Sequence, residues 1–289
     1  MKLRWPLVCL CFVASTAVAQ IQIELRFPRL QYIAYEPVVA DLVITNLAGR
    51  DVYLRDADGQ SWFGIEVSEN EGRSIAPTST AGTEPLNLAA GKRVTRKINL
   101  GPLFVVHDFG TYRVRAHIYF ADLNKFFYSQ TKVFEVTDAR PIWQKTVGVP
   151  ERESTSGHVR TYSLMTNRFP DHTSLYVRVE DKDSGVVYAT YSLGRVIAFG
   201  EPQTEFDQSN QLHVLYCAAP RNWSYARVGL NGELLSRASF AETKTRPRLV
   251  HTEQGVIKIA GGMIDTPVTQ ATRDTAQKLS ARPPNAPKD

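Results

Sequence analysis

The stretch HDFGTYRVRAHIYF, residues 107–120, is the most regular part of the sequence. From Tyr112 onward apolar side chains fall on every second position, which is the period of a β-strand with one buried face. The face predicted to be buried consists of Tyr112, Val114, Ala116, Ile118 and Phe120. The opposite face consists of Arg113, Arg115, His117 and Tyr119. The stretch therefore predicts one core strand and a second face that could bind a partner.

The rest of the chain indicates an all-β fold. Short alternating runs separated by Gly, Pro, Asn and Asp dominate, and no long apolar segment has the period of a helix. In the first half, about Gln20 to Asp138, seven such runs are predicted to be strands: residues 21–27, 38–46, 51–54, 62–67, 92–100, 111–120 and 128–136. Seven strands in about 120 residues is typical of an immunoglobulin-like β-sandwich.

The residues just before the core strand support that interpretation. Asp108-Phe109-Gly110-Thr111-Tyr112 resembles the D-x-G-x-Y tyrosine corner of immunoglobulin-like and fibronectin-type domains. The resemblance implies that the hydroxyl of Tyr112 bonds to backbone a few residues upstream and fixes the corner. It implies a scaffold and no particular function, because such sandwiches serve many functions.

The first nineteen residues have the pattern of a secretory signal peptide. Lys2 and Arg4 precede a short apolar core, and Ala17-Val18-Ala19 predicts cleavage after Ala19. The mature protein is then expected to be secreted or periplasmic. We expect no membrane insertion after removal of the signal, because no later segment reaches the roughly 20 apolar residues that span a bilayer. Removing the signal leaves Cys217 as the one cysteine, so no intramolecular disulfide is predicted.

The charge of the chain does not indicate nucleic-acid binding. The formal net charge is +5 and the pI about 9.1, but much of the excess comes from the signal peptide and the C-terminal tail. A nucleic-acid site needs basic side chains clustered on one surface. Residues 266–289 are rich in Thr, Ala and Pro and are predicted to be a disordered tail.

The second half is predicted to be a separate, repetitive domain. A linker is predicted over residues 139–157, and a repetitive antiparallel β-domain over residues 158–265. Leu175–Val179, Leu212–Tyr216 and Val256–Ala260 recur at intervals near 40 residues, which resembles the blade repeats of β-propellers. The half is too short for a closed ring within one chain, so we expect a second β-sandwich, an open curved stack or a ring completed by oligomerisation. Asn231-Gly232 predicts a type I′ hairpin turn within it.

Two sets of residues have spacings that metal ligands can show. His172, His213 and His251 recur at similar intervals, but His213 falls within a predicted strand and the other two in loops. Asp181–Gly185 and Asp56–Gly59 place alternating carboxylates before a glycine, as calcium loops do, yet they lack the distal glutamate. We therefore interpret the histidines as core or solvated residues and the aspartates as hairpin turns. No metal, cofactor-binding or catalytic residue is assigned, and no cofactor is expected.

The outward face of the core strand is the predicted partner-binding face. It consists of Arg113, Arg115, His117 and Tyr119, and Phe126, Phe127 and Tyr128 follow in the next turn and strand. Cations beside aromatic rings suit a protein or glycan partner. The alternative is a solvated strand face on which the arginine stems lie along the sheet.

The sequence favours a non-enzymatic, secreted or periplasmic binding or scaffold protein, since it contains no catalytic motif. One alternative is an envelope hydrolase or lyase with a site in the second domain, using His172, His213, Glu205 or Asp207. Another alternative is a proteinase inhibitor that acts through loops of the sandwich.

Overall fold

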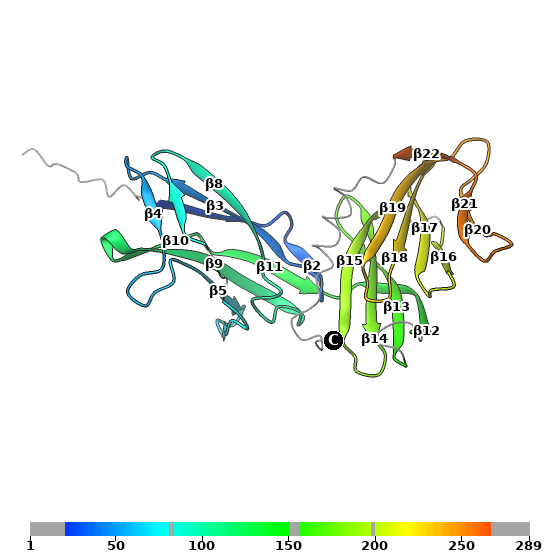
Figure 1. Cartoon of the computed structure of the whole chain (residues 1–289), viewed down its shortest axis with the longest axis horizontal. Coiled ribbons are helices and arrows are strands. Elements are labelled where there is room, and N and C mark those ends of the chain that lie inside the picture. Colours follow the sequence, from blue (N-terminus) through cyan, green and yellow to red (C-terminus); the bar gives the residue numbers. More distant parts are fainter. Residues whose placement is uncertain (1–20, 81, 83, 151–156, 198–199, 267–289) are drawn as a thin grey trace, which may run out of the picture.

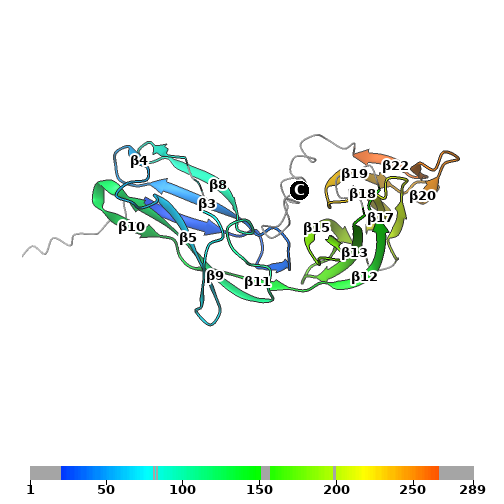
Figure 2. The same cartoon turned by 60° about the horizontal axis from the view of Figure 1, so that its bottom comes forward.

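The computed structural model describes residues 21–80, 82, 84–150, 157–197 and 200–266. The predicted signal peptide lies outside this part of the chain, as do residues 267–289 of the predicted tail. Figure 1 shows two groups of strands that follow one another along the chain, and Figure 2 shows them from another side. The one helical element of the described residues is the 3-10 turn at Ala121–Leu123. The all-β fold class is thus confirmed, and no described helix is long and apolar enough to cross a membrane.

Two sheets form the first half. One has the order β1-β3-β8, with bounds Ile21–Arg26, Val39–Asn46 and Arg93–Asn99. The other has the order β2-β11-β9-β5-β6, with bounds Gln31–Ile33, Lys132–Thr137, Gly110–Phe120, Phe63–Glu69 and Ser74–Ile75. The remaining strands are β10 (Lys125–Tyr128), which pairs with β9, and the separate pair β4 (Val52–Leu54) and β7 (Leu86–Leu88). The sheets enclose one apolar core, which Ile44 and Ile118 join from opposite sides.

Strand β9 lies at the centre of its sheet, as its alternation predicts. All five residues of its predicted inner face are buried. The Tyr112 hydroxyl donates a hydrogen bond to the backbone oxygen of Asp108 over 2.8 Å, which confirms the predicted contact. The Tyr112 ring also stacks on Phe134 of β11, with ring centroids 5.2 Å apart. The corner therefore fixes the start of β9 against its neighbouring strand.

The second half consists of two meanders that follow the chain order. The first sheet is β12-β13-β14-β15, with bounds Arg140–Gly148, Val159–Arg168, Thr173–Asp181 and Val187–Val196. The second is β16-β17-β18-β19-β22, with bounds Gln203–Phe206, Leu212–Ala219, Asn222–Val228, Leu234–Ala241 and Met263–Thr266. Their facing surfaces form a common core, to which Val177 and Val214 belong. A separate hairpin, β20 (Arg248–His251) with β21 (Ile257–Ala260), adds Leu249 and Ile259 to a small cluster on the second sheet.

The predicted linker is wrong over much of its length. Strand β12 occupies Arg140–Gly148 and pairs along β13. Most of its side chains are exposed, and only Trp143 and Val147 contact the core. An edge strand of this kind is held mainly by its backbone ladder, so it carries little of the apolar alternation by which strands are recognised.

The apparent repeats do not occupy equivalent places in the two sheets. Leu175–Val179 lies in β14, the third strand of its sheet, whereas Leu212–Tyr216 lies in β17, the second strand of the next. Any fully buried strand carries a similar apolar run, so the spacing reflects strand length plus turn length rather than one repeated unit.

The Asn231-Gly232 turn also differs from the prediction. A type I′ turn needs positive φ at both residues, but only Gly232 has it, at +80°. Gly232 donates its backbone N–H to Gly229, and Gly229 donates its own to Glu233. The loop between Gly229 and Glu233 thus has one residue more than the two-residue loop of a type I′ hairpin. Its last residue is Gly232, which has the left-handed conformation.

The two halves contact each other through the segments just before and just after β2 and through the outer face of β14. Arg29 pairs with the buried carboxylate of Glu36 and donates to the Tyr176 hydroxyl over 2.9 Å. Arg178 of β14 donates to the backbone oxygen of Ala34, also over 2.9 Å. These bonds surround a small apolar cluster that contains Ile33 and Tyr176.

Candidate functional site

The outward side of β9 carries a cluster of polar and aromatic side chains from three neighbouring strands. We call it the β9 face and define it by Glu66, Arg115, His117, Phe126 and Tyr128. The ladders explain the cluster: Arg115 lies opposite Glu66 of β5, and His117 lies opposite Tyr128 of β10. Neighbours across a ladder on one face lie close enough for their side chains to interact.

Arg115 is held in one orientation by two partners. Its Nε donates to a carboxylate oxygen of Glu66 over 2.7 Å. Its guanidinium lies 4.4 Å from the ring centroid of Tyr128, within the range of a cation–π contact. Arg115 and Tyr128 nevertheless both remain exposed, Tyr128 at 47%. The pair is therefore an ordered cation and ring at the protein surface.

His117 packs against the sheet beneath this pair. A Cβ at Gly64, opposite it on β5, would lie 2.3 Å from His117 Nε2, so the absence of a side chain there makes room for the ring. The imidazole lies beside Phe126 and Tyr128, with centroids 5.5 and 5.7 Å away. Burial lowers the pKa of His117, and the nearby Arg115 acts in the same direction while Glu66 opposes both.

Two residues of the predicted face have other surroundings. Tyr119 is buried, with its hydroxyl 3.1 Å from carboxylate and amide oxygens of Asp58 and Asn124. Its inclusion in an exposed face is therefore wrong. The turn before β5 brings Asp58 to its hydroxyl, and the turn after β9 brings Asn124 there. Arg113 is exposed as predicted and bonds weakly to Asn70, at 3.4 Å. Phe126 and Tyr128, which follow in the next turn and strand, pair with β9 as part of β10 and so join its outward face.

The aspartate loops are built as turns. Asp181 accepts backbone N–H bonds from Asp183 and Ser184 and pairs with Arg160 at 2.6 Å and His158 at 3.0 Å. Burial alone would raise the pKa of Asp181, but the bonds from Ser184, His158 and Asp183 lower it on balance.

The loop in the first half has the same construction. Asp56 accepts the backbone N–H of Trp62 and the hydroxyl of Ser61, at 2.9 and 3.3 Å. Across the described ranges, no group of three or more His, Cys, Asp or Glu side chains is arranged to hold a metal ion.

The structure brings together part of the histidine and carboxylate set. His213 Nε2 lies 3.2 Å from Asp207, and its Nδ1 lies 2.8 Å from the Tyr225 hydroxyl. His251 of the hairpin lies 3.2 Å from Glu205 of β16.

His172 lies apart from this group and pairs with Asp171. His213 is 4% exposed and both of its ring nitrogens have partners, so a substrate has no direct access to the ring. Burial lowers the pKa of His213. His251 thus joins the hairpin to β16, and His213 joins β17 to Asp207 and to Tyr225 of β18. The hydrolase alternative remains a prediction.

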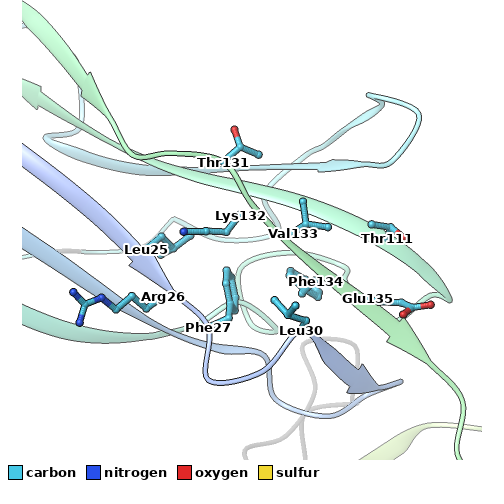
Figure 3. Close-up of a pocket in the computed structure, with 10 residues that line it drawn as sticks. All are labelled: Leu25, Arg26, Phe27, Leu30, Thr111, Thr131, Lys132, Val133, Phe134 and Glu135. Carbon is cyan, nitrogen blue, oxygen red and sulfur yellow. The ribbon is translucent and has the colours of Figure 1, made fainter. Parts of the chain in front are cut away.

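A groove that no sequence pattern predicts lies beside β11 (Figure 3). We call it the β11 groove; its volume is about 660 Å³. It opens where the chain crosses from β1 to β2 and so from one sheet to the other. The lining residues are Leu25, Arg26, Phe27, Leu30, Thr111, Thr131, Lys132, Val133, Phe134 and Glu135.

No protein-family model matches the chain, and no curated protein matches it at significant similarity.

Proposed function

We propose that the chain is a secreted or periplasmic, non-enzymatic binding protein whose β9 face docks on another protein. The observation that supports the proposal is the clamp of Arg115 between Glu66 and Tyr128. Arginine and tyrosine are the residue types most often found at the energetic centres of protein interfaces. A side chain that is already ordered loses less conformational entropy on binding, so the clamp favours association.

The geometry favours a protein partner over a glycan. Sugar rings bind by lying on an open aromatic face, but the guanidinium of Arg115 stacks on Tyr128 and His117 lies beside the same ring. Arg115 and Tyr128 line neither the β11 groove nor two further grooves among the described residues, one beside Trp143 and one beside Trp62. Exposed, ordered polar and aromatic groups are typical of protein interfaces, whereas small ligands bind in concave sites.

We also propose that the first half is an immunoglobulin-like module. Strands β1, β3 and β8 form one sheet and β5, β9 and β11 the other, which is the division of the A, B, E and C, F, G strands in that fold. The hydrogen bond from Tyr112 to Asp108 supports the same assignment. Modules of this kind commonly serve as rigid carriers of binding surfaces.

The test compares capture by the wild type with capture by the double variant Arg115→Ala/Tyr128→Ala. Immobilised full-length protein is incubated with the secreted and envelope proteins of the source cells, and bound proteins are cross-linked and identified by mass spectrometry. A specific partner should bind the double variant at least about tenfold more weakly, a loss of about 1.4 kcal/mol.

The matched control is Arg93→Ala/Lys97→Ala, which removes two exposed cations from β8 of the other sheet. This control should bind the partner as the wild type does. Equal capture by the wild type and the Arg115→Ala/Tyr128→Ala variant would refute the proposal. Binding to a glycan array that depends on the same two side chains would identify the partner as a glycan instead of a protein.

A further inference from the structure

The two strands that border the β11 groove are unequal in length. Strand β11 runs from Lys132 to Thr137, but β2 pairs only with its last part, from Glu135 onward. Among the described residues, no strand lies beside the first part of β11 on that side. The first part of β11 is therefore a sheet edge.

The backbone of Val133 points to this open edge. Glu135 donates its N–H away from β9, to the backbone oxygen of Leu30 over 2.7 Å. Peptide groups two residues apart on a strand point to the same side, so the N–H and C=O of Val133 also point away from β9. Its side chain is 43% exposed. Val133 thus presents a donor and an acceptor where a further strand could pair.

Apolar side chains line the space beside that edge. Phe27 and the exposed Leu30, both in the segment between β1 and β2, lie beside the buried Phe134 of β11 in Figure 3. The rings of Phe27 and Phe134 are 5.4 Å apart. A strand added at Val133 would turn alternate side chains toward this apolar surface.

A lysine without a direct ion pair lies in the same part of the groove. Arg26 lowers the pKa of Glu24 most strongly, and this lysine is near enough to that carboxylate to add to the effect. Arg26 is engaged by both carboxylate oxygens of Glu24, each at 2.6 Å. Lys132 is half-buried and makes no direct ion pair with any described residue. An acidic side chain brought next to Lys132 would therefore gain a charge-assisted hydrogen bond.

We propose that the β11 groove binds an extended segment of a partner protein, which adds to the sheet as a strand beside Val133. The segment carries an acidic side chain against Lys132 and, two residues away, an apolar side chain over Phe27 and Leu30. Backbone hydrogen bonds supply affinity in this mode of recognition, and alternate side chains supply specificity. The groove lies apart from the β9 face, so this inference does not rest on the proposed function.

A second copy of the chain fits the edge less well. Antiparallel pairing of two β11 edges about Val133 would bring the two Lys132 ammonium groups into one shared groove. Like charges so placed repel each other, and lysines on edge strands oppose self-pairing in this way.

Fluorescence anisotropy with two labelled synthetic peptides tests the proposal. Both peptides alternate threonine with the apolar residues leucine and valine. They differ at one position, two residues before the leucine, where one peptide carries a glutamate and the other a lysine. The wild type should bind the glutamate peptide at least about tenfold more tightly than the lysine peptide. The variant Lys132→Glu should reverse that preference.

Val133→Pro and Val133→Thr form the decisive pair of variants. Proline removes the edge N–H without touching the ladder to β9, whereas threonine keeps the donor and the branched shape. Val133→Pro should weaken binding of the glutamate peptide about tenfold, while Val133→Thr should leave it nearly unchanged. Circular dichroism and a thermal unfolding curve should show the same fold for both.

Three results would overturn the proposal. The first is that the wild type binds neither peptide, and the second is that the two Val133 variants bind the glutamate peptide equally. The third is a dimer of the wild type, seen by sedimentation, that Val133→Pro abolishes, since the occupant would then be a second copy. The variant Arg115→Ala/Tyr128→Ala should bind the peptide normally, which separates this site from the β9 face.

Discussion

The two halves of the molecule build their cores by different routes. In the first half neighbouring strands are distant in the chain, as in the order β1-β3-β8, and the chain crosses repeatedly between sheets. In the second half each four-stranded meander, β12–β15 and β16–β19, follows the chain order. Local pairing costs less loop entropy than distant pairing. Two all-β cores of one chain can therefore differ in the sequence separation between the strands that pair within them.

The halves also differ in what they bury. The first half buries fewer polar side chains, Glu36 and Asn46 among them, and its Tyr112 hydroxyl bonds at the rim. The second sandwich buries Arg160 and Asp181 as an ion pair, and the Tyr162 hydroxyl lies inside it, 3.0 Å from the backbone oxygen of Gly229. Buried polar groups are costly unless they are fully paired. We therefore expect the second half to be the more sensitive to loss of single polar groups.

The largest effect is expected from Asp181→Ala. The substitution leaves Arg160 in the interior without its carboxylate, and breaking a buried ion pair in this way costs about 3–5 kcal/mol. Urea titration followed by tryptophan fluorescence gives the free energy of unfolding. The exposed neighbour in the same turn provides the control, Asp183→Ala. Equal losses from the two variants would contradict a structural role for the buried pair.

A smaller effect is expected from Gly232→Ala. A Cβ there would lie 2.4 Å from the Cβ of Ala189 on the facing sheet, and φ is +80°. Overpacking of this kind costs about 1–3 kcal/mol. In the first half Gly59 has a similar φ of +73° with nothing within 4 Å, so Gly59→Ala measures the backbone strain alone. Thermal unfolding should show the larger loss for Gly232→Ala; a similar loss in both would mean that the contact with Ala189 adds nothing.

Removal of single tyrosine hydroxyls gives a direct comparison of the two cores. Tyr112→Phe loses one bond at the rim, which is worth about 1 kcal/mol. Tyr162→Phe loses the donor to Gly229 and a longer contact to Asn210, so it should cost about 1–2 kcal/mol. Chemical denaturation of both variants beside the wild type measures the difference. A greater loss for Tyr112→Phe would reverse our ranking of the two halves.

The smallest effect is a change in the pH dependence of stability. Burial lowers the pKa of His213 below 6.5, so the unfolded chain takes up its proton at a higher pH than the folded chain does. The free energy of unfolding should therefore decrease as pH falls from about 6.5 toward the lowered pKa, by at most about 1.4 kcal/mol per pH unit.

The test is the slope of stability against pH in His213→Gln. The slope should become shallower, and His117→Gln should act in the same direction from the first half, since burial lowers the pKa of His117 too. An unchanged slope in His213→Gln would show that this ring does not contribute.

Sequence patterns predicted the parts of the fold that alternate cleanly. Strand β9 and the Tyr112 contact followed from residues 107–120 because one face is wholly apolar and the corner motif is local. Strand β12 was missed because it is an edge strand with mostly exposed side chains. The Asn231-Gly232 turn was assigned the wrong type because loop length depends on which residues pair, and a dipeptide does not specify that.

The binding surfaces were predicted only in part. Arg115 and His117 could be placed on one face from the alternation of β9 alone. Tyr119 belongs to the same alternation, but turns from elsewhere in the chain cover it, and no local pattern indicates that. The β11 groove depends on β2 being shorter than β11, which is a property of strand pairing across the whole first half.

The β20–β21 hairpin covers apolar side chains on the outer face of the second sheet of the second half. A sheet with an apolar outer face can accept another sheet there, within one chain or between chains. The hairpin places Leu249 and Ile259 on the outer face of the second sheet, and His251 and Glu205 fasten it there. It thereby occupies part of the apolar outer face on which a further sheet would otherwise have to pack.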